Sequence, residues 1–446
     1  MKYIRILLLI LVSLSCLILY YHILYTSNVI FHAKENTSII VWWTPFTGLS
    51  YNKRVCNYGS CIFTENRSFV QSSHDTKAIL FYGSDFSIED LPLPRKEYHW
   101  WGLLHEESPK NQPLFDHEEA LSLFNLTSTF RRGSSMPLTL QYLQSIDALT
   151  SKHYFVSTSQ KNMLLKENHL SPILYLQSDC NPPSKRDDYV KELAKFIPVD
   201  SYGSCLNNKE LPSDLKGIES MNHPELLKLI AKYKFTLSLE NAECEDYITE
   251  KLWRPLTVGS VPIYWGSPSV ARWIPNNESI VHVRDFSTPQ QLANYILNIL
   301  SDDTLYEKYL SHKLYGKVSN TILIEFMEQR TWGINEDQEH QGTFVDAFEC
   351  FICDQISKFH NVAKSGSFVA NKSHYGCPIP KVVLNSSSAN NEFWEEQWHK
   401  ASGEAHVLNQ LILTPPGVFS SDDFYGNVIS YLEKTNFFRK HGHEEF

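Results

Sequence analysis

The 446-residue chain lacks an excess of basic residues, because 40 lysines and arginines stand against 50 aspartates and glutamates, a net charge of −10. A general nucleic-acid-binding protein needs a basic face, so nucleic acid is not an expected partner. The sequence also lacks a repeat with a period of 20–50 residues, which argues against solenoids and propellers. Charged residues make up 20% and hydrophobic residues 42%, so bulk disorder is excluded.

The N-terminal segment lacks aspartate and glutamate up to residue 34 and carries a long apolar run over residues 6–25. About 20 apolar residues are enough to cross a bilayer as a helix. Lys2 and Arg5 precede the run, so residues 1–5 are predicted to form a cytosolic tail. A cleaved signal peptide is the alternative, but the run ends in tyrosines that suit a membrane interface better. We therefore expect an uncleaved signal-anchor helix of a single-pass type II membrane protein, followed by a stem over residues 26–38.

Cysteines and glycosylation sequences favour a lumenal location for the body of the chain. Eight cysteines lie outside the apolar run, and an even number in an oxidising compartment favours disulfides. The Cys350-x-x-Cys353 pair is alternatively suited to redox chemistry or to half of a zinc site. Six asparagines lie in N-glycosylation acceptor patterns, namely Asn36, Asn66, Asn125, Asn277, Asn371 and Asn385.

The chain ends in His443-Glu-Glu-Phe446, which is similar to the KDEL-type signal for retention in the endoplasmic reticulum. Glutamate replaces aspartate and phenylalanine replaces leucine, and a chance acidic tail is the alternative. A lumenal C-terminus could be read by a retention receptor. The expected location is therefore the endoplasmic reticulum membrane, with the Golgi membrane as the alternative.

Short apolar runs alternate with helical patterns along most of the chain, which is typical of α/β units with parallel sheets. Strands are expected over residues 39–43, 78–82, 99–105, 173–176, 199–202, 235–239, 261–265 and 280–283. Helices are expected over residues 187–196 and 247–258, and after the Ser267-Pro268 and Thr288-Pro289 pairs. The pattern predicts two α/β domains, over residues 39–169 and 170–355, that face each other across a cleft. Residues 356–446 are expected to form a linker and a helical extension.

Charged and polar residues are densest over residues 238–255, between a predicted strand and a predicted helix. In open α/β sheets, ligands bind beyond the carboxyl ends of strands, and anions bind at helix N-termini. Asp246 or Thr249 is suited to cap the helix, Lys251 to neutralise a phosphate and Glu250 to bind sugar hydroxyls. The residues alone favour the alternative, a solvated helix with ordinary capping and i,i+4 partners.

A longer pattern carries a family resemblance. Tyr247-Ile-Thr-Glu-Lys251, followed by Val261-Pro-Ile-Tyr-Trp-Gly-Ser-Pro268, closely resembles the donor-binding signature of the α1,3-fucosyltransferase family, the tenth family of glycosyltransferases. The resemblance covers about residues 39–355. Further segments resemble motifs of this family, namely Trp42-Trp43-Thr-Pro-Phe46, Glu107-Ser-Pro109, Ser178-Asp-Cys-Asn181 with Arg186 and Tyr189, and Asp200-Ser-Tyr-Gly203.

The resemblance implies a GT-B fold of two Rossmann-like domains, GDP-β-L-fucose as the donor, and inverting transfer with no metal or other cofactor. The sequence contains no Asp-x-Asp pair, the usual metal bridge to a nucleotide-sugar diphosphate. Cationic side chains and backbone dipoles are then needed to stabilise the departing GDP. The residues implied to bind the donor are Arg186, Tyr247, Glu250 and Lys251, with Glu240 and Asn241 at the end of the preceding strand.

Inversion in one displacement needs a single general base for the acceptor hydroxyl. By resemblance this base is Glu107, and the neighbouring Glu106 is its competitor. The chain departs from the family at Phe130-Arg-Arg-Gly133-Ser-Ser135, where the family has Tyr-Arg-x-Asp-Ser-Asp, so both acidic residues of the usual acceptor contacts are absent. A second departure is Ser178-Asp179, where the family has Ser-Asn.

The C-terminal extension, the KDEL-like end and Tyr264-Trp-Gly-Ser-Pro268 together resemble a divergent animal branch of the family. That branch is associated with O-fucosylation of serine or threonine in EMI-type cysteine-rich domains, so secretory-pathway glycoproteins are the expected acceptors. A glycan α1,3-fucosyltransferase acting on N-glycans or lactosamine is one alternative, and an inactive lumenal binding protein is another. The family ties its C-terminal Cys-x-x-Cys to the N-terminal domain, which makes the candidate bridges Cys56, Cys61, Cys350 and Cys353.

Overall fold

The computed structural model describes residues 37–45, 47–48, 51–167, 169–217, 220–333, 342–359, 368–384 and 392–435. The predicted tail, the signal-anchor helix over residues 6–25, and the retention-like end lie outside these residues, as do the sequons at Asn36 and Asn385. Within the described ranges, none of the helices has the length and apolar character needed to cross a membrane.

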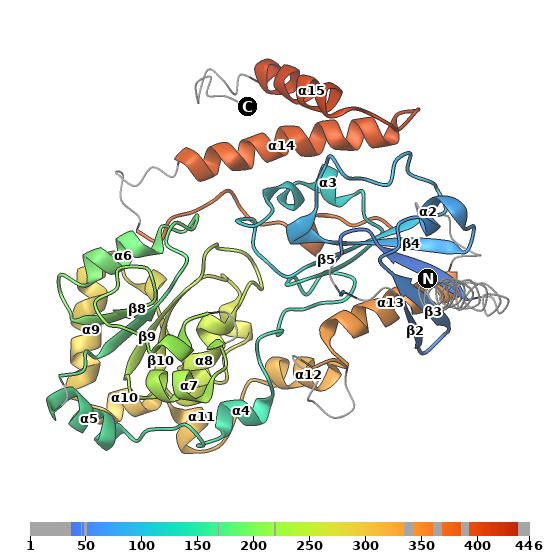
Figure 1. Cartoon of the computed structure of the whole chain (residues 1–446). Helices are drawn as coiled ribbons and strands as arrows, with labels where there is room; N and C mark the ends of the chain where they lie inside the picture. Colours follow the sequence, from blue (N-terminus) through green and yellow to red (C-terminus); the bar gives the residue numbers. More distant parts are fainter. Residues whose placement is uncertain are drawn as a thin grey trace, which may run out of the picture.

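The first domain is built on a six-stranded sheet with the order β2-β3-β1-β4-β5-β6 (Figure 1). Neighbouring strands are parallel except β2 and β3, which form an antiparallel edge. The strands are β1 (Ser38–Trp42), β2 (Asn52–Val55), β3 (Ser60–Thr64), β4 (Thr76–Tyr82), β5 (Trp100–His105) and β6 (Leu126–Thr129). The predicted apolar runs form β1, β4 and β5, which lie inside the sheet and are largely buried, as central parallel strands require.

The second domain contains five parallel strands in the order β11-β10-β9-β7-β8. They are β7 (Ile173–Leu176), β8 (Val199–Tyr202), β9 (Phe235–Leu239), β10 (Val261–Trp265) and β11 (Val281–His282). This is the 2-1-3-4-5 order of doubly wound sheets, and the order reverses between β7 and β9. The predicted α/β class with parallel sheets is confirmed.

Helices cover both faces of the second sheet. One face packs against α6 (Arg186–Leu193) and α9 (Pro289–Ser301), and the other against α7 (Pro224–Ala231) and α8 (Glu250–Val258). Thr288 caps α9 and Pro289 is its first residue, as predicted. Ser267-Pro268 does not begin an α-helix. A short 3₁₀ turn (Val270–Arg272) follows it, and the Ser267 hydroxyl accepts the Asp246 N–H at 2.9 Å and the Ser269 N–H at 3.3 Å.

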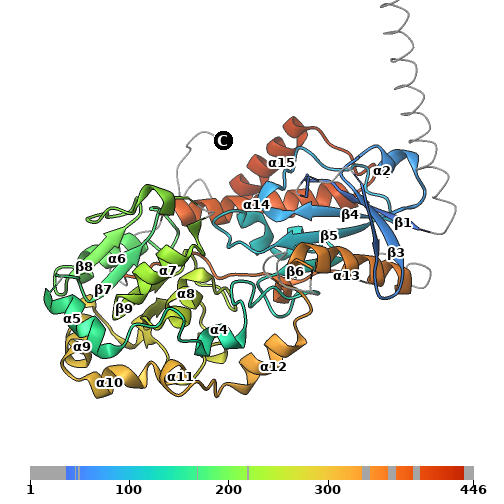
Figure 2. The same cartoon turned by 60° about the horizontal axis from the view of Figure 1, so that its bottom comes forward.

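The domain boundaries in the structure differ from those predicted. The helices α4 (Ile146–Thr150) and α5 (Thr158–Glu167) pack on the second domain, where Lys161 donates to the carbonyls of Tyr233 and Gly259. After α10 (Asp303–Lys308), α11 (Ser311–Leu314) and α12 (Thr321–Gln329), the chain returns to the first domain. There α13 (Phe344–Phe359) covers one face of the sheet (Figure 2), because its apolar side packs on β1, β4 and β5.

Disulfides fix this return of the chain. Cys350 is bonded to Cys56 and Cys353 to Cys61, so α13 is attached to the edge of the first sheet at two points. These are the four cysteines for which the family resemblance implied bridges. The structure also joins Cys180 to Cys205 and Cys244 to Cys377.

The C-terminal extension packs on the opposite face of the first sheet from α13 (Figure 2). It contains α14 (Glu392–Leu413) and α15 (Ser421–Lys434), which contact each other, and α14 also contacts the short helix α3 (Glu118–Leu121). Leu408 and Val428 are fully buried in the core that this layer shares with the sheet. The apolar pieces predicted in this part of the chain are therefore the inner faces of two packed helices.

Three of the predicted glycosylation asparagines, Asn66, Asn277 and Asn371, are exposed. A glycan on Asn125 is incompatible with this fold, contrary to the prediction. Asn125 is only 4% exposed, and its side-chain N–H donates to the Phe368 carbonyl at 2.8 Å. Its side-chain oxygen accepts from the Trp101 N–H at 2.8 Å, so the amide is fully used inside the protein.

Candidate active site

A pocket of about 690 Å³ opens beyond the carboxyl ends of β7 and β8. It is lined by the loops that follow these strands and by the first turns of α8. Four cationic side chains line it, namely Arg186, Lys216, Lys251 and Arg254. The volume lies in the range of small-molecule sites, and the carboxyl edge of a doubly wound sheet is where such ligands bind.

The start of α8 is held by Thr249 and Glu240. Thr249 is the N-cap, and its hydroxyl accepts the Lys251 N–H. Glu240 lies directly after β9 and accepts both the backbone N–H and the hydroxyl of Thr249, each at 2.8 Å. Glu240 is fully buried and anchors the start of α8, and its part in donor binding stays a prediction. Asn241 is 8% exposed and does not line the pocket.

The helix begins later than predicted, so Tyr247 lies in the loop before α8. Asp246 in this loop has a left-handed backbone (φ +63°), and its carboxylate accepts from the Ser269 hydroxyl and the Trp273 indole. Thr249 rather than Asp246 caps the helix. These contacts turn the Tyr247 ring away from the second sheet and toward the first domain, where it packs on Phe130 at 5.1 Å between ring centroids.

The first turns of α8 form a charged cluster in the pocket wall. Lys251 Nζ lies 3.2 Å from Glu250 Oε1, and Arg254 lies 3.6 Å from the same oxygen. Burial raises the pKa of Glu250, but the two cations outweigh burial and bring that pKa to about 2. Glu250 therefore stays ionised. Arg254 was not predicted, although its position four residues after Glu250 places it on the same helix face.

Arg186, at the start of α6, connects the pocket to the sheet. It is 1% exposed, and its guanidinium donates to the Leu239 carbonyl at 3.0 Å and the Asp179 carbonyl at 2.8 Å. In the described part of the chain, its Nε has no hydrogen-bond partner. Buried donors without partners are rare, which favours an anion as their partner in the pocket.

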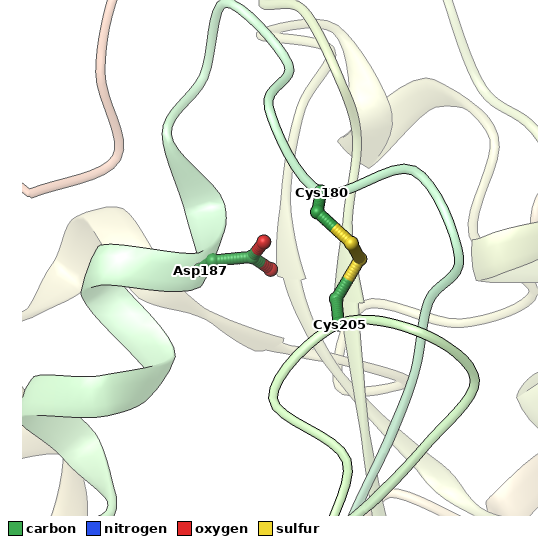
Figure 3. Close-up of side chains that lie close together, drawn as sticks. All are labelled: Cys180, Asp187 and Cys205. Carbon is green, nitrogen blue, oxygen red and sulfur yellow. A yellow bond between two sulfur atoms is a disulfide. The ribbon is translucent and has the colours of Figure 1, made fainter.

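A disulfide braces the other wall of the pocket (Figure 3). Cys180 and Cys205 join the loop after β7 to the loop after β8. Asp187 points toward this disulfide, and the three side chains are close enough for metal binding among the described residues. A metal needs a thiolate, however, and both sulfurs are bonded to each other, so this cluster holds the loops and not an ion. The Asp187 carboxylate accepts from the Tyr175 hydroxyl.

Glu107 enters the site from the first domain, directly after β5. The Tyr247 hydroxyl donates to Glu107 Oε2 at 3.3 Å, which joins the two domains at this point. Burial raises the pKa of Glu107, and the charge of Glu250 adds to the rise. Lys251, Tyr247 and Lys110 oppose it. The structure thus places Glu107 beside the residues of the donor-binding signature.

Glu106 faces its own domain. It accepts from the Tyr82 hydroxyl at 2.9 Å and is 9% exposed. Burial raises the pKa of Glu106 to about 7. The charge of Glu107 also raises the pKa of Tyr82, Tyr142 and Tyr375, in each case as a smaller cause than burial. Among the described contacts, only the second of the two adjacent glutamates therefore reaches the second domain.

The two departures from the family pattern both lie at the contact between the domains. Asp179, where the family has asparagine, forms an ion pair with Lys110, three residues after Glu107. Gly133, where the family has aspartate, lies against the C-terminal segment, and a Cβ at residue 133 would be 2.5 Å from the Ser373 carbonyl oxygen. The extension therefore occupies the space that an acidic side chain would need.

We predict that Gly133→Ala destabilises the fold by about 1–3 kcal/mol, because the added methyl group forces Ser373 to move. Urea unfolding measures the change. Gly426→Ala in α15 is the matched control, since no atom lies within 4 Å of its added Cβ. An exposed helical glycine gains about 0.5–1 kcal/mol from this substitution. Equal stability changes for both variants would contradict the predicted clash.

Comparisons with known proteins agree with this geometry. The family model described as "Glycosyltransferase family 10 (fucosyltransferase) C-term" matches residues 166–368, and "Fucosyltransferase, N-terminal" matches residues 34–142. The chain is 45% identical to GDP-fucose protein O-fucosyltransferase 3 of Homo sapiens over 88% of this chain and 83% of the relative. It is also 45% identical to the Xenopus laevis protein of the same name, over 85% and 82% of the two chains.

A solved structure of an α1,3-fucosyltransferase with GDP is 16% identical, with a TM-score of 0.43 over 74% of this chain and 92% of that one. A likeness at this level supports no conclusion about the site. The two family models and the relatives match most of the chain, and these matches are sufficient to assign the family. The chain belongs to glycosyltransferase family 10, the fucosyltransferases.

Proposed function

We propose that the chain transfers L-fucose from GDP-β-L-fucose to a serine or threonine hydroxyl of a cysteine-rich protein domain, with inversion at the anomeric carbon. The names of the relatives, which are 45% identical, support both the donor and the protein acceptor. The single observation that carries the mechanism is the 3.3 Å contact between Tyr247 and Glu107, because it brings the carboxylate of one domain to the donor signature of the other.

In the proposed step, ionised Glu107 takes the proton of the acceptor hydroxyl as the oxygen attacks the anomeric carbon. The bond from that carbon to the GDP oxygen breaks, and the electron pair leaves with the diphosphate. Lys251 and Arg254, with Arg186 behind them, line the pocket that would receive this charge. Glu250 is ionised and is placed among these cations to accept hydrogen bonds from sugar hydroxyls.

We further propose that this reaction takes place in the lumen of the endoplasmic reticulum, with residues 6–25 as the membrane anchor. The apolar run, the retention-like end and the four disulfides support this location. The Golgi membrane is the alternative. Disulfides persist in either compartment, so they support a lumenal body without distinguishing the two.

The acceptor class can be tested with purified enzyme and GDP-fucose. A folded EMI-type cysteine-rich domain is expected to be fucosylated, while N-acetyllactosamine is not, because Gly133 and Ser135 lack the acidic side chains of the glycan-acting members. Intact-mass measurement detects the added deoxyhexose, and the same domain with its acceptor serine or threonine changed to alanine is the control. Transfer to N-acetyllactosamine alone would support the glycan-directed alternative, and no turnover of GDP-fucose would support a binding protein.

A further inference from the structure

Residues 371–377, which we call the strap, pass through the contact between the two domains. The strap lies outside both family models, which end at residues 142 and 368. Its Ser373 carbonyl lies against Gly133, and its His374 carbonyl accepts from the Thr129 hydroxyl at the end of β6. His374 Nδ1 also lies 2.9 Å from the Thr127 hydroxyl. These contacts seat the first half of the strap on the carboxyl edge of the first sheet.

The second half of the strap is bonded to both domains. Cys377 forms a disulfide with Cys244, three residues before Tyr247 in the second domain. The Cys377 N–H donates to the Asp116 carboxylate of the first domain. Both cysteines and Asp116 are buried. A covalent bond therefore holds the strap to the loop that carries Tyr247, while a hydrogen bond to a buried carboxyl group holds it to the domain that carries Glu107.

Between these attachments, Tyr375 contacts the backbone of the base. Its side chain is fully buried, and its hydroxyl donates to the Glu107 carbonyl at 2.8 Å. Its ring stacks on His105 with centroids 5.3 Å apart and packs on Phe130 at 5.0 Å. Phe130 in turn packs on Tyr247, so one continuous aromatic group joins the strap to the hydroxyl that contacts the Glu107 carboxylate.

We propose that the strap is part of the active site and that Tyr375 is a positioning residue, which orients Glu107 against the donor-binding loop. This inference rests on the proposed function, in which Glu107 is the base. The base lies at the end of a strand, where the backbone is free to rotate unless another element holds it. In this chain, the extension supplies that element as Tyr375. Its hydroxyl donates to the Glu107 carbonyl, and its ring is held between His105 and Phe130.

Tyr375→Phe tests the inference, because it removes the hydroxyl and keeps the ring. We expect kcat for fucose transfer to fall about ten-fold or more, since small displacements of a reacting group are costly. The KM for GDP-fucose should stay within about two-fold, because Tyr375 does not line the donor pocket. We also expect the acid limb of the kcat profile to move to higher pH, as a displaced Glu107 loses Tyr247 and Lys251, which hold its pKa down against burial.

Tyr306→Phe is the matched control. Tyr306 is equally buried and its hydroxyl also donates to a backbone carbonyl, that of Lys234 at 3.0 Å, within the second domain. The Tyr306→Phe variant should leave kcat and the pH profile unchanged. Amide hydrogen exchange over residues 105–110 gives a second readout that needs no acceptor. Exchange there should rise in Tyr375→Phe and not in Tyr306→Phe.

The outcomes separate the inference from the function on which it rests. Wild-type exchange over residues 105–110 and an unshifted pH profile in Tyr375→Phe would overturn the positioning role, even if Glu107 is the base. Faster exchange in this segment, together with a wild-type enzyme that transfers no fucose, would leave the positioning role intact and overturn the proposed function. A parallel loss of kcat in Tyr306→Phe would show general destabilisation and would also overturn the inference.

Discussion

Glu107→Gln is expected to lower kcat for fucose transfer by about 10²–10⁴-fold, the range typical of a lost general base. The amide keeps the size of the carboxylate and can still accept from the Tyr247 hydroxyl, but it cannot take the acceptor proton. GDP binding should persist, because the pocket beyond β7 and β8 does not include Glu107. Calorimetric titration with GDP measures this directly beside the kinetic assay.

Glu106→Gln is the matched control for this variant, since the same change is made one residue earlier. Glu106 faces Tyr82 and does not contact the second domain in the described contacts, so we expect kcat to change less than ten-fold. A larger loss in Glu106→Gln than in Glu107→Gln would transfer the role of base to Glu106.

The pH profile gives an independent check on the base. The pKa of Glu107 is raised, chiefly by burial, and a base must be deprotonated to act. Activity is therefore present above this raised pKa and is lost as the pH falls through it. The acid limb of kcat should lie above the ordinary range of a glutamate, and Glu107→Gln should abolish that limb in its residual activity.

Lys251→Met is expected to lower kcat/KM for GDP-fucose by about 10²–10³-fold, with weaker binding of GDP. The loss of one preorganised charge partner of a developing anion typically has this size. Here the ammonium group lines the pocket and also lies 3.2 Å from Glu250 and 3.7 Å from Glu240. Without Lys251, two buried carboxylates lose a partner, so repulsion of the diphosphate adds to the lost attraction.

Lys228→Met on α7 is the control for Lys251→Met. Lys228 is exposed and pairs only with Glu225 among its described ion-pair partners, so both kcat/KM and GDP affinity should stay at the wild-type level. Thermal unfolding of both variants shows how much of the loss is due to stability. A folded Lys251→Met enzyme with wild-type affinity for GDP would contradict the role of Lys251 at the diphosphate.

The donor side of the site was largely predictable from the sequence. The strands that carry it, β7, β8, β9 and β10, are continuous apolar runs, and parallel strands buried on both faces need such runs. The family resemblance implied Arg186, Glu250 and Lys251 together, and the structure places all three on one pocket. The sequence did not reveal that Glu240 holds the start of α8, because a carboxylate after a strand can serve a ligand or cap the next helix, and the pattern is the same in both cases.

The edge of the first sheet was not predictable in the same way. The β2 strand, Asn-Lys-Arg-Val, carries charged side chains and alternates between partial burial and exposure, so no apolar run marks it. Its position is decided by Arg54, which forms ion pairs with Asp346 and Glu349 of α13. These partners are about 290 residues away in the chain, and local patterns carry no signal over such a separation.

By itself, the sequence determined the α/β class, the parallel strands and the family, because these depend on local hydrophobic patterns and short ordered motifs. Only the tertiary structure decided that α13 returns to the first sheet, that Gly133 makes room for Ser373, and that Tyr375 reaches the carbonyl of Glu107. Each of these contacts joins segments far apart in the chain, so no local sequence pattern identifies the two partners.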